Sequence, residues 1–496
     1  MLLQKFKKWL TLAKLDIKPH QIRGMEFCIE RENTISPYGV RGGIIADEMG
    51  LGKTILMLGC IISNFMGPKR RTNTLIVLPP SLLPQWIAIF KKFTGHSPLI
   101  YHGKFVKSIT SKCLKTAPIV ITTYGMIASN KKGGSPLWNI EWNRLIMDEA
   151  HHIRNMKSGI FCGAKKIKAD IKWLVTGTPI QNKKSDLYAL CIVLGLKPAL
   201  FRSPLKIKII IGHHVLRRTK KDVGINLPPL IEEIINVPWS SEEEEELARQ
   251  IHYHATFSRV TVKNVNSIIH NMTSHSFATL IRARQVCVFP RALQTIMKKL
   301  QYRSEHHVDT KLLTCSKVSA ITKHIISRSY NKRRKIVFCY YKAEIDIICA
   351  LLREKNIGVC AIDGRTKKKE RILFLDPPIT QEKFGSVCKK WNRNNYVYDF
   401  INPYISPQVI VVQIQTACEG LNLQHFQEVY FTSPHWNPAV EDQAIARAHR
   451  IGQNEKVNVF RFVMENFKTE GDDCLTLDNY CIQIQDKKRE LAKILD

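Results

Sequence analysis

The chain alternates short apolar runs with longer segments of helical periodicity. In the first half the apolar runs are "GIIAD", "TLIVLPP", "PIVITTY", "RLIMDEA" and "KWLVTGT". Polar or glycine-rich residues follow each run, and helix-length segments separate most of them. Strands that alternate with helices in this way form parallel sheets. The pattern therefore predicts an α/β fold, in which ligands bind beyond the carboxyl ends of the strands.

The same architecture returns in the second half as "KIVFCYY", "GVCAIDG", "QVIVVQI", "EVYFTSP" and "VNVFRFV". Between the halves the sequence is polar and helical, and "SSEEEEELARQ" predicts a helix start with Ser240 or Ser241 as the N-cap. Residues 372–407 lack clean periodicity and predict an insertion with loops. We expect three regions: a first lobe over 1–224, a helical connector over 225–330 and a second lobe over 331–496.

Charge changes this picture by pointing to a partner. The 496 residues exceed one ordinary core, and 44% hydrophobic with 24% charged residues is typical of a globular protein. The net charge of +33 predicts a polyanionic partner, with nucleic acid as the first candidate and acidic lipid as the alternative. The basic residues lie in short clusters such as "RRTKK" and "KRRK". This spread favours a basic groove over a flexible tail, although any one cluster is also compatible with a solvated face.

The cysteines and the N-terminus argue against two other classes. The fourteen cysteines include no C-x-x-C pair, so we expect no zinc site and reduced, intracellular thiols. The segment "MLLQKFKKWLTLAKLDIKPH" carries lysines across its apolar face and lacks a cleavage site, so it is not a secretory signal. No apolar run approaches the ~20 residues that span a bilayer. We therefore expect no membrane partner.

The stretch "DEMGLGKT", residues 47–54, resembles a phosphate-binding loop, but it has Asp47 where the strict pattern has glycine. Gly50 and Gly52 would let backbone N–H groups converge on phosphate oxygens. Lys53 would reach the β- and γ-phosphates, and the Thr54 hydroxyl would bind Mg²⁺. An apolar strand precedes the loop and an apolar helix follows it. Alone, the stretch is also compatible with an ordinary strand–turn–helix connection.

A pair of carboxylates strengthens the nucleotide interpretation. "MDEAHHIRN" places Asp148 and Glu149 at the end of an apolar strand. An ATPase needs one carboxylate there for Mg²⁺ and a second to activate the attacking water. An exposed acidic turn is the alternative. Downstream, "TGTPIQN" offers the hydroxyls of Thr176 and Thr178 near the nucleotide.

A third motif supplies cations. "EDQAIARAHRIGQ" sets Gln443, Arg447 and Arg450 at i, i+4 and i+7, which predicts one shared helical face. Two arginines directed at a γ-phosphate would stabilise charge in the transition state, as arginine fingers do. A solvated basic helix is the alternative interpretation.

Together these stretches resemble the ordered motifs of a SWI/SNF-type DNA-dependent ATPase of helicase superfamily two. The motifs are "PHQIRG", "DEMGLGKT", "LIVLPPSLLPQW", "IVITTYGMI", "DEAHHIRN", "TGTPIQN", "LRRTKKDV", "IVFCYY", "IDGRT", "QTACEGLNL" and "SPHWNPAVEDQAIARAHRIGQ". The resemblance runs from about residue 17 to 465 and resumes at "IQIQDKKRELAKIL", which resembles the family's C-terminal bracing helix. It implies two RecA-like lobes, ATP and Mg²⁺ as cofactors, and double-stranded DNA as the partner.

The resemblance also implies residue roles. The family usually has Asp at the position of Asp47, which favours a real nucleotide site. The implied catalytic residues are Lys53, Glu149, Arg447 and Arg450. The implied ATP-binding residues are Gln21, Asp47, Glu48, Met49, Gly50, Leu51, Gly52, Lys53, Thr54 and Gln443, with Thr54 and Asp148 on the metal. The implied DNA-binding residues are Ser81, Thr123, Thr416, Asn422 and Trp436.

Some features depart from the family or leave alternatives open. Cys418 and Glu419 replace small residues, and the cysteines of the RING finger found in a related subgroup are missing, so ubiquitin-ligase activity is not implied. The rival functions are a strand-separating helicase and a non-enzymatic scaffold with a decayed motor. Nucleosomes and the transcription or repair machinery are candidate partners. We expect a nuclear location, or a viral replication factory in the host cytoplasm if a virus encodes the chain.

Overall fold

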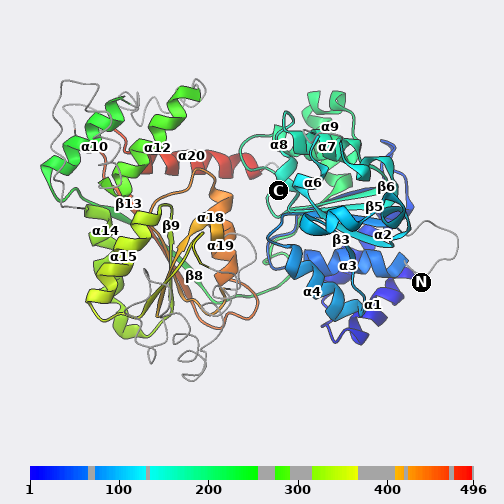
Figure 1. Cartoon of the computed structure of the whole chain (residues 1–496), viewed down its shortest axis with the longest axis horizontal. Helices are drawn as coiled ribbons and strands as arrows, with labels where there is room; N and C mark the ends of the chain where they lie inside the picture. Colours follow the sequence, from blue (N-terminus) through cyan, green and yellow to red (C-terminus); the bar gives the residue numbers. More distant parts are fainter. Residues whose placement is uncertain are drawn as a thin grey trace. The chain divides into compact units, whose positions relative to one another are not determined.

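The computed structural model describes residues 1–64, 73–129, 134–254, 274–290, 315–366, 408–417, 423–468 and 474–493. The chain divides into two compact units. Unit 1 comprises Met1–Asn226 with Lys488–Asp496, and unit 2 comprises Leu227–Lys487. Among the described residues, each unit contains one sheet whose strands pair in parallel, with helices packed against the sheet (Figure 1). The predicted α/β fold with two parallel-sheet lobes is therefore confirmed.

In the described part of unit 1 the sheet has seven strands, in the order β3-β4-β2-β5-β6-β1-β7. Its strands are β1 (Gly42–Ile45), β2 (Thr74–Leu78), β3 (Leu99–Tyr101), β4 (Ile119–Thr123), β5 (Glu141–Asp148), β6 (Lys168–Val175) and β7 (Val215–Leu216). Five of them coincide with the predicted apolar runs. The strands β3 and β7 are three and two residues long, which is too short to show a period in the sequence.

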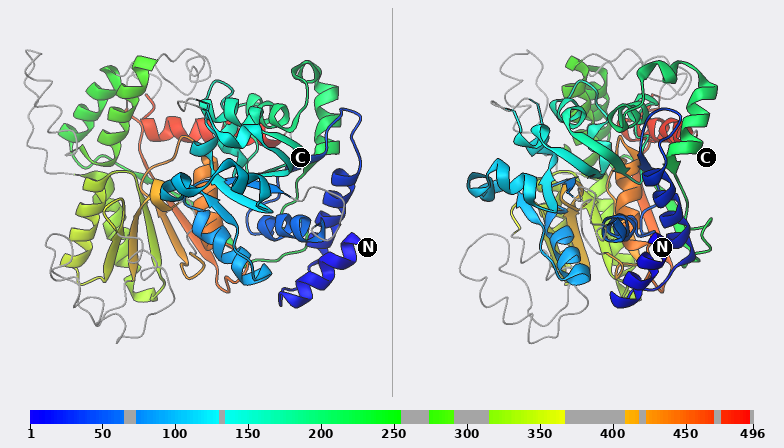
Figure 2. Two further views of the ribbon diagram at one scale, coloured as in Figure 1. Left: turned by 45° about the vertical axis from the view of Figure 1, so that its right-hand side comes forward. Right: turned by 90° about the vertical axis from the view of Figure 1, so that its right-hand side faces the viewer.

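Helices cover both faces of this sheet (Figures 1 and 2). One face carries α1 (Leu2–Leu12), α2 (Pro19–Asn33), α3 (Lys53–Asn64) and α4 (Leu83–Thr94). The other carries α6 (Tyr124–Ile127), α7 (Gly159–Lys166), α8 (Ser185–Leu194) and α9 (Pro204–His214), and a short α5 (Ser111–Thr116) precedes β4. Alternate residues of β2 enter the two cores, because successive side chains of a strand point to opposite faces.

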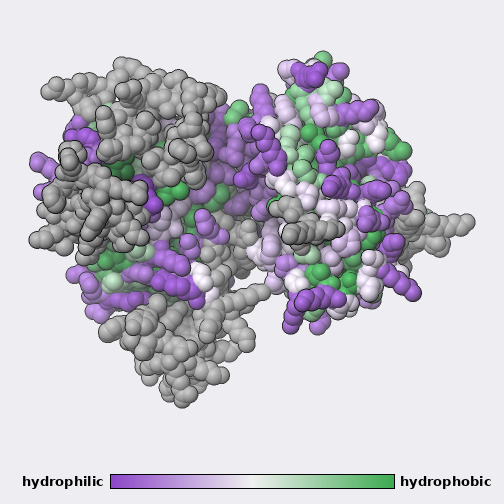
Figure 3. All heavy atoms as spheres, turned by 45° about the horizontal axis from the view of Figure 1, so that its top comes forward, coloured by the Kyte–Doolittle hydropathy of each residue, from purple (hydrophilic) through white to green (hydrophobic). Residues whose placement is uncertain are grey.

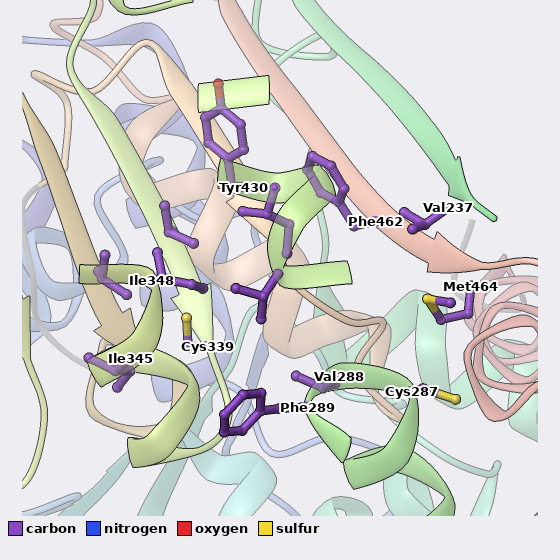
Figure 4. Close-up of a cluster of buried hydrophobic side chains, with 14 of the residues drawn as sticks. Val237, Cys287, Val288, Phe289, Cys339, Ile345, Ile348, Tyr430, Phe462 and Met464 are labelled. Carbon is purple, nitrogen blue, oxygen red and sulfur yellow. The ribbon is translucent and has the colours of Figure 1, made fainter. Parts of the chain in front are cut away.

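The residues of unit 2 that the structure describes form a six-stranded sheet in the order β10-β11-β9-β12-β13-β8. Its strands are β8 (Leu230–Val237), β9 (Lys335–Cys339), β10 (Val359–Ile362), β11 (Val409–Gln413), β12 (Glu428–Phe431) and β13 (Val457–Met464). Its described helices are α10 (Glu242–His254), α12 (Ser274–Val288), α14 (Ser316–Ser327), α15 (Lys342–Glu354), α18 (Ile414–Ala417), α19 (Pro438–Ala448) and α20 (Leu477–Ala492), of which α20 continues into unit 1 from Lys488. Figure 4 shows part of its larger core, where Phe289, Ile348 and Phe462 from different elements converge.

The start of unit 2 corrects the prediction of a helical connector from residue 225. Residues 230–237 form β8, which pairs in parallel with β13 over eight positions. The sequence "LIEEIINV" hid this strand because β8 lies at the edge of the sheet, where Ile231 and Ile234 stay 45% and 52% exposed. The predicted helix does begin at Glu242, and the backbone N–H of Glu244 donates to Oγ of Ser241 at 3.2 Å, as an N-cap requires. The predicted insertion at 372–407 lies outside the described residues.

The described surface is largely hydrophilic on the face shown in Figure 3, with smaller hydrophobic patches between. Large exposed apolar side chains, such as Leu205 and Tyr330, are few among the described residues and are ordinary for a protein surface. Within the described part of the chain, the structure has no helix with the length and apolar character needed to cross a bilayer.

Candidate active site

The phosphate loop lies between β1 and the first turn of α3. Gly50 and Gly52 have φ of +93° and +84°, which side chains on L-residues rarely adopt. A Cβ on Gly52 would also lie 2.4 Å from Nε2 of Gln21, so any side chain there would displace the Gln21 amide. The Nζ atom of Lys53 donates to the carbonyl oxygens of Asp47 at 2.7 Å and Glu48 at 3.3 Å. The loop thus presents its ammonium group at the N-terminus of a helix, a setting that favours phosphate.

Residues from other segments of unit 1 contact the phosphate loop. The carbonyl of Leu51 pairs with Nε2 of buried His20 at 3.2 Å. The side chain of Met49 lies 3.4 Å from a Cβ built on Gly177, in the "TGT" motif. Thr54 is half-buried in the first turn of α3. The loop residues predicted to bind ATP therefore form one compact structure.

The carboxylates of Asp47 and Glu48 have protein partners. Asp47 is 1% exposed and accepts two hydrogen bonds from Arg218, at 3.0 Å and 2.5 Å. Glu48 pairs with Nζ of Lys220 at 2.9 Å. The sequence places both residues among those implied to bind ATP, and it gives no sign of these two ion pairs. Their carbonyl oxygens face Lys53, whereas their carboxylates hold the loop to the segment after β7.

Asp148 ends β5 and is buried. Its Oδ2 accepts a hydrogen bond from Nε1 of Trp86 at 2.7 Å, and its Oδ1 accepts one from the backbone N–H of Glu149 at 3.0 Å. Burial, assisted by the charge of Glu149, raises the pKa of Asp148 to about 6, while the Trp86 bond and the charge of Lys53 lower it. A buried carboxylate that needs more positive charge to stay ionised fits a hard divalent cation such as Mg²⁺.

Glu149 sits in a strained turn that links two motifs. Its φ of +51° is left-handed, which is uncommon outside glycine and clusters at functional sites. The Tyr124 hydroxyl fixes this turn by donating to the Asp148 carbonyl at 2.7 Å. Nδ1 of His151 lies 3.3 Å from both Oε2 of Glu149 and Oγ1 of Thr176. The structure therefore joins the "DEAH" and "TGT" motifs through a histidine.

The cationic motif in unit 2 differs from its predicted geometry. Gln443 and Arg447 lie on α19, but this helix ends at Ala448 and Arg450 lies in the following turn. The turn is stabilised by Gln453, whose amide bonds the Ala448 carbonyl, and by Gly452, whose φ is +100°. The prediction that all three residues share one helical face is therefore wrong.

Arg447 and Arg450 are still electrostatic neighbours. Burial and then the charge of Arg447 lower the pKa of Arg450. Because the phosphate loop belongs to the other unit, an arginine-finger role for this pair stays a prediction.

The predicted DNA contacts have varied surroundings. Ser81 is exposed just before α4. Thr123 is 2% exposed, and its hydroxyl lies 3.1 Å from Nδ1 of His102, so it is occupied in this conformation. Trp436 is half-buried against the ring of Tyr480. Thr416 lies in the short helix α18, and Asn422 lies outside the described residues.

Arg284 is a buried residue beside Trp436 that belongs to none of the motifs quoted above. It is 7% exposed, lies 4.0 Å from the centre of the Tyr340 ring and 5.7 Å from that of Trp436, and donates to the Pro434 carbonyl. It therefore holds the loop that carries Trp436. In the sequence Arg284 lies in the stretch "LIRARQVCVFP", which gives no local indication of its contact with Trp436.

A phosphate loop after β1 and an Asp–Glu pair after β5, both at the carboxyl ends of parallel strands, define a nucleotide hydrolase of the P-loop class. Comparisons with known protein families agree. The SNF2-related domain matches residues 20–292, and the helicase conserved C-terminal domain matches residues 316–452. The chain belongs to the SNF2-related family, and it is a DNA-dependent ATPase with helicase-like motifs.

Individual relatives cover nearly the whole chain. An Arabidopsis thaliana protein, named as a SWI/SNF-related matrix-associated actin-dependent regulator of chromatin, is 26% identical and aligns with 97% of this chain and 72% of its own length. A protein of the Orgyia pseudotsugata multicapsid polyhedrosis virus, named as a probable global transactivator, is 26% identical over 95% of this chain and 89% of its own. The SWI2/SNF2 ATPase core of Sulfolobus solfataricus in complex with dsDNA is 24% identical, covers 97% of each chain and has a TM-score of 0.40.

Proposed function

We propose that this protein hydrolyses ATP to move along duplex DNA and to remodel protein–DNA complexes without net strand separation. The observation that carries the proposal is the intact hydrolytic set in unit 1: Lys53 in the phosphate loop, and Asp148 and Glu149 after β5. The motifs "LRRTKKDV" and "RAHRIGQ" support the translocase branch, which they resemble, over the strand-separating branch.

Each residue of the set has a role in the proposed reaction. The Gln21 amide, beside Gly52, binds the adenine edge, and Lys53 binds the β- and γ-phosphates. Thr54 and Asp148 would hold Mg²⁺, and the bound ion would neutralise charge that develops on the phosphates. Glu149 orients the attacking water and accepts its proton.

DNA binding rests on the charge and on the family. With a net charge of +33, the contacts are made mainly to phosphates and are independent of sequence. Relatives include an ISWI chromatin-remodelling ATPase of Saccharomyces cerevisiae and the DNA repair protein RAD5B of Arabidopsis thaliana, of which this chain covers 39% and 45%. These names support nucleosomes or repair complexes as partners. They also support a nuclear site of action, with a cytoplasmic viral site as the alternative suggested by the baculovirus relative.

The experiment that tests the proposal measures ATP turnover with naked duplex DNA, nucleosomes, single-stranded DNA and RNA in parallel. Duplex DNA should stimulate turnover most, and nucleosomes should stimulate at least as strongly as their free DNA. Equal or stronger stimulation by single-stranded DNA or RNA would favour the strand-separating helicase. Absence of turnover with every polymer, alongside normal DNA binding, would favour the scaffold.

A further inference from the structure

The feature that the ATPase mechanism leaves unexplained is Asp47, which stands where a strict phosphate loop has glycine. Its carboxylate is 1% exposed and is held by both nitrogen branches of Arg218, with Nε at 3.0 Å and Nη2 at 2.5 Å. A buried carboxylate with a bidentate guanidinium partner is a strong, directional contact. Asp47 is therefore an anchor for the loop and has no open carboxylate edge for a nucleotide.

Arg218 contacts a second part of the nucleotide site. Its Nη1 donates to the carbonyl of His20, next to Gln21 at the start of α2. A Cβ on Gly24 would lie 2.9 Å from Nη2 of Arg218, so the missing side chain at Gly24 leaves room for the guanidinium. One side chain thus fixes both the phosphate loop and the start of the helix that carries the proposed adenine contact.

Neighbours of Arg218 repeat the pattern. Lys220 binds Glu48 twice, through Nζ at 2.9 Å and through its backbone N–H at 2.7 Å. The backbone N–H of Glu48 donates to the Arg218 carbonyl at 2.9 Å. On the other side, Arg217 donates to the carbonyl of Ala492, at the end of α20, at 3.1 Å.

This segment lies close in the chain to the point where the chain leaves unit 1. Residues 217–220 lie shortly before Asn226, where the chain leaves unit 1, and α20 is the helix by which it returns at Lys488. Both connections between the units therefore meet, within unit 1, at residues that also hold the phosphate loop.

We propose that Arg218 is a positioning residue for the phosphate loop, acting through Asp47, and that residues 217–220 couple nucleotide occupancy to the two chain connections between the units. This inference rests on the nucleotide site described above. In this proposal Arg218 contacts no phosphate, and its effect on ATP binding passes through Asp47.

The test is a double-mutant cycle with Asp47→Gly, which restores the strict glycine pattern, and Arg218→Gln. The full-length chain is used, and binding of a fluorescent ATP analogue is measured by titration. Either single change should weaken binding of the analogue by roughly tenfold or more. Because the two residues act as one unit, the double variant should bind the analogue no more weakly than the single variant with the lower affinity. Lys221→Ala is the matched control, since Lys221 is an exposed cation of the same segment.

A second readout separates positioning from general stability. ATP-analogue affinity is measured with and without saturating duplex DNA, and the ratio of the two affinities gives the coupling between the sites. Arg218→Lys keeps a charge but loses the planar fork, so the ratio should fall towards one while the melting temperature stays near that of the parent. A melting temperature that falls together with an unchanged ratio would overturn the coupling claim.

Other outcomes are equally distinct. If Asp47→Gly binds the nucleotide as tightly as the parent chain, the anchor role is wrong. If Arg218→Gln weakens binding further in the Asp47→Gly background, part of its effect does not pass through Asp47 and the inference fails. If Lys53→Ala leaves binding of the ATP analogue unchanged, the assignment of the nucleotide site is wrong. This result distinguishes failure of the proposed function from failure of this inference.

Discussion

Acid should loosen unit 2 at one identifiable histidine. His252, in α10, is 1% exposed. Its Nδ1 pairs with the Ala248 carbonyl at 2.7 Å, and its Nε2 accepts the backbone N–H of Leu477 at 3.0 Å, at the start of α20. The ring is therefore neutral, with its proton on Nδ1. Protonation of Nε2 would break the bond to Leu477.

The size of the effect follows from the pKa. Burial lowers the pKa of His252 to about 4, against 6.5 for an ordinary histidine. At a pH between these two values, the unfolded chain binds a proton at His252 that the folded chain does not. The contribution of neutral His252 to stability is therefore complete above about pH 6.5 and is lost as the pH falls towards 4. A pH of 5.0 lies about 1.5 units below the ordinary pKa of 6.5. At 1.36 kcal/mol per unit, the free energy of unfolding of unit 2 should therefore be about 2 kcal/mol lower at pH 5.0 than above pH 6.5.

His252→Gln tests this value, because glutamine can accept the Leu477 hydrogen bond but does not titrate. The assay is urea-dependent hydrogen–deuterium exchange of the peptide containing Leu477, corrected for the intrinsic effect of pH. The parent chain should lose about 2 kcal/mol more than the variant between pH 7.5 and 5.0. His213→Gln, at an exposed histidine of unit 1, should behave like the parent. An equal loss in the parent and in His252→Gln would refute the reasoning.

Three further predictions concern catalysis and DNA. Trp86→Phe removes the hydrogen bond that lowers the pKa of Asp148, so the acid limb of kcat/KM against pH should move to higher pH; an unchanged profile would contradict the role of this bond. Arg450→Ala should lower DNA-stimulated kcat by roughly 10³-fold with little change in nucleotide or DNA binding, and Arg450→Lys should not restore it; a mild loss of DNA affinity with kcat intact would instead indicate a solvated basic turn. Duplex affinity should fall with salt at a slope of roughly −0.9 per phosphate neutralised, and a salt-independent affinity would contradict phosphate-led binding.

Local patterns in the sequence predicted most of the fold. Every described strand longer than three residues, except β8, corresponds to an apolar run found beforehand. The strand β8 escaped because its position at the sheet edge leaves isoleucine and glutamate exposed side by side. Arg450 departs from the helical spacing because the helix ends before Gly452, a residue typical of helix ends, which adopts a φ of +100°.

The residues of the site also fall into those that local sequence patterns predict and those that they do not. The phosphate loop and the Asp–Glu pair are contiguous in the chain, so their motifs reveal them. Partners that are distant in sequence leave no local signal. Trp86 is 62 residues from Asp148, and Arg218 is 171 residues from Asp47. These contacts exist only because the parallel sheet brings the carboxyl ends of separate strands together.

The measurement that most directly tests the central claim is displacement of a triplex-forming third strand, run beside release of an annealed strand from a forked duplex. The parent chain with ATP should displace the third strand and leave the forked duplex intact. Glu149→Gln should bind ATP, because Lys53 is unchanged, yet displace nothing. Efficient release of the annealed strand, or displacement by Glu149→Gln at the parent rate, would contradict an ATP-driven duplex translocase.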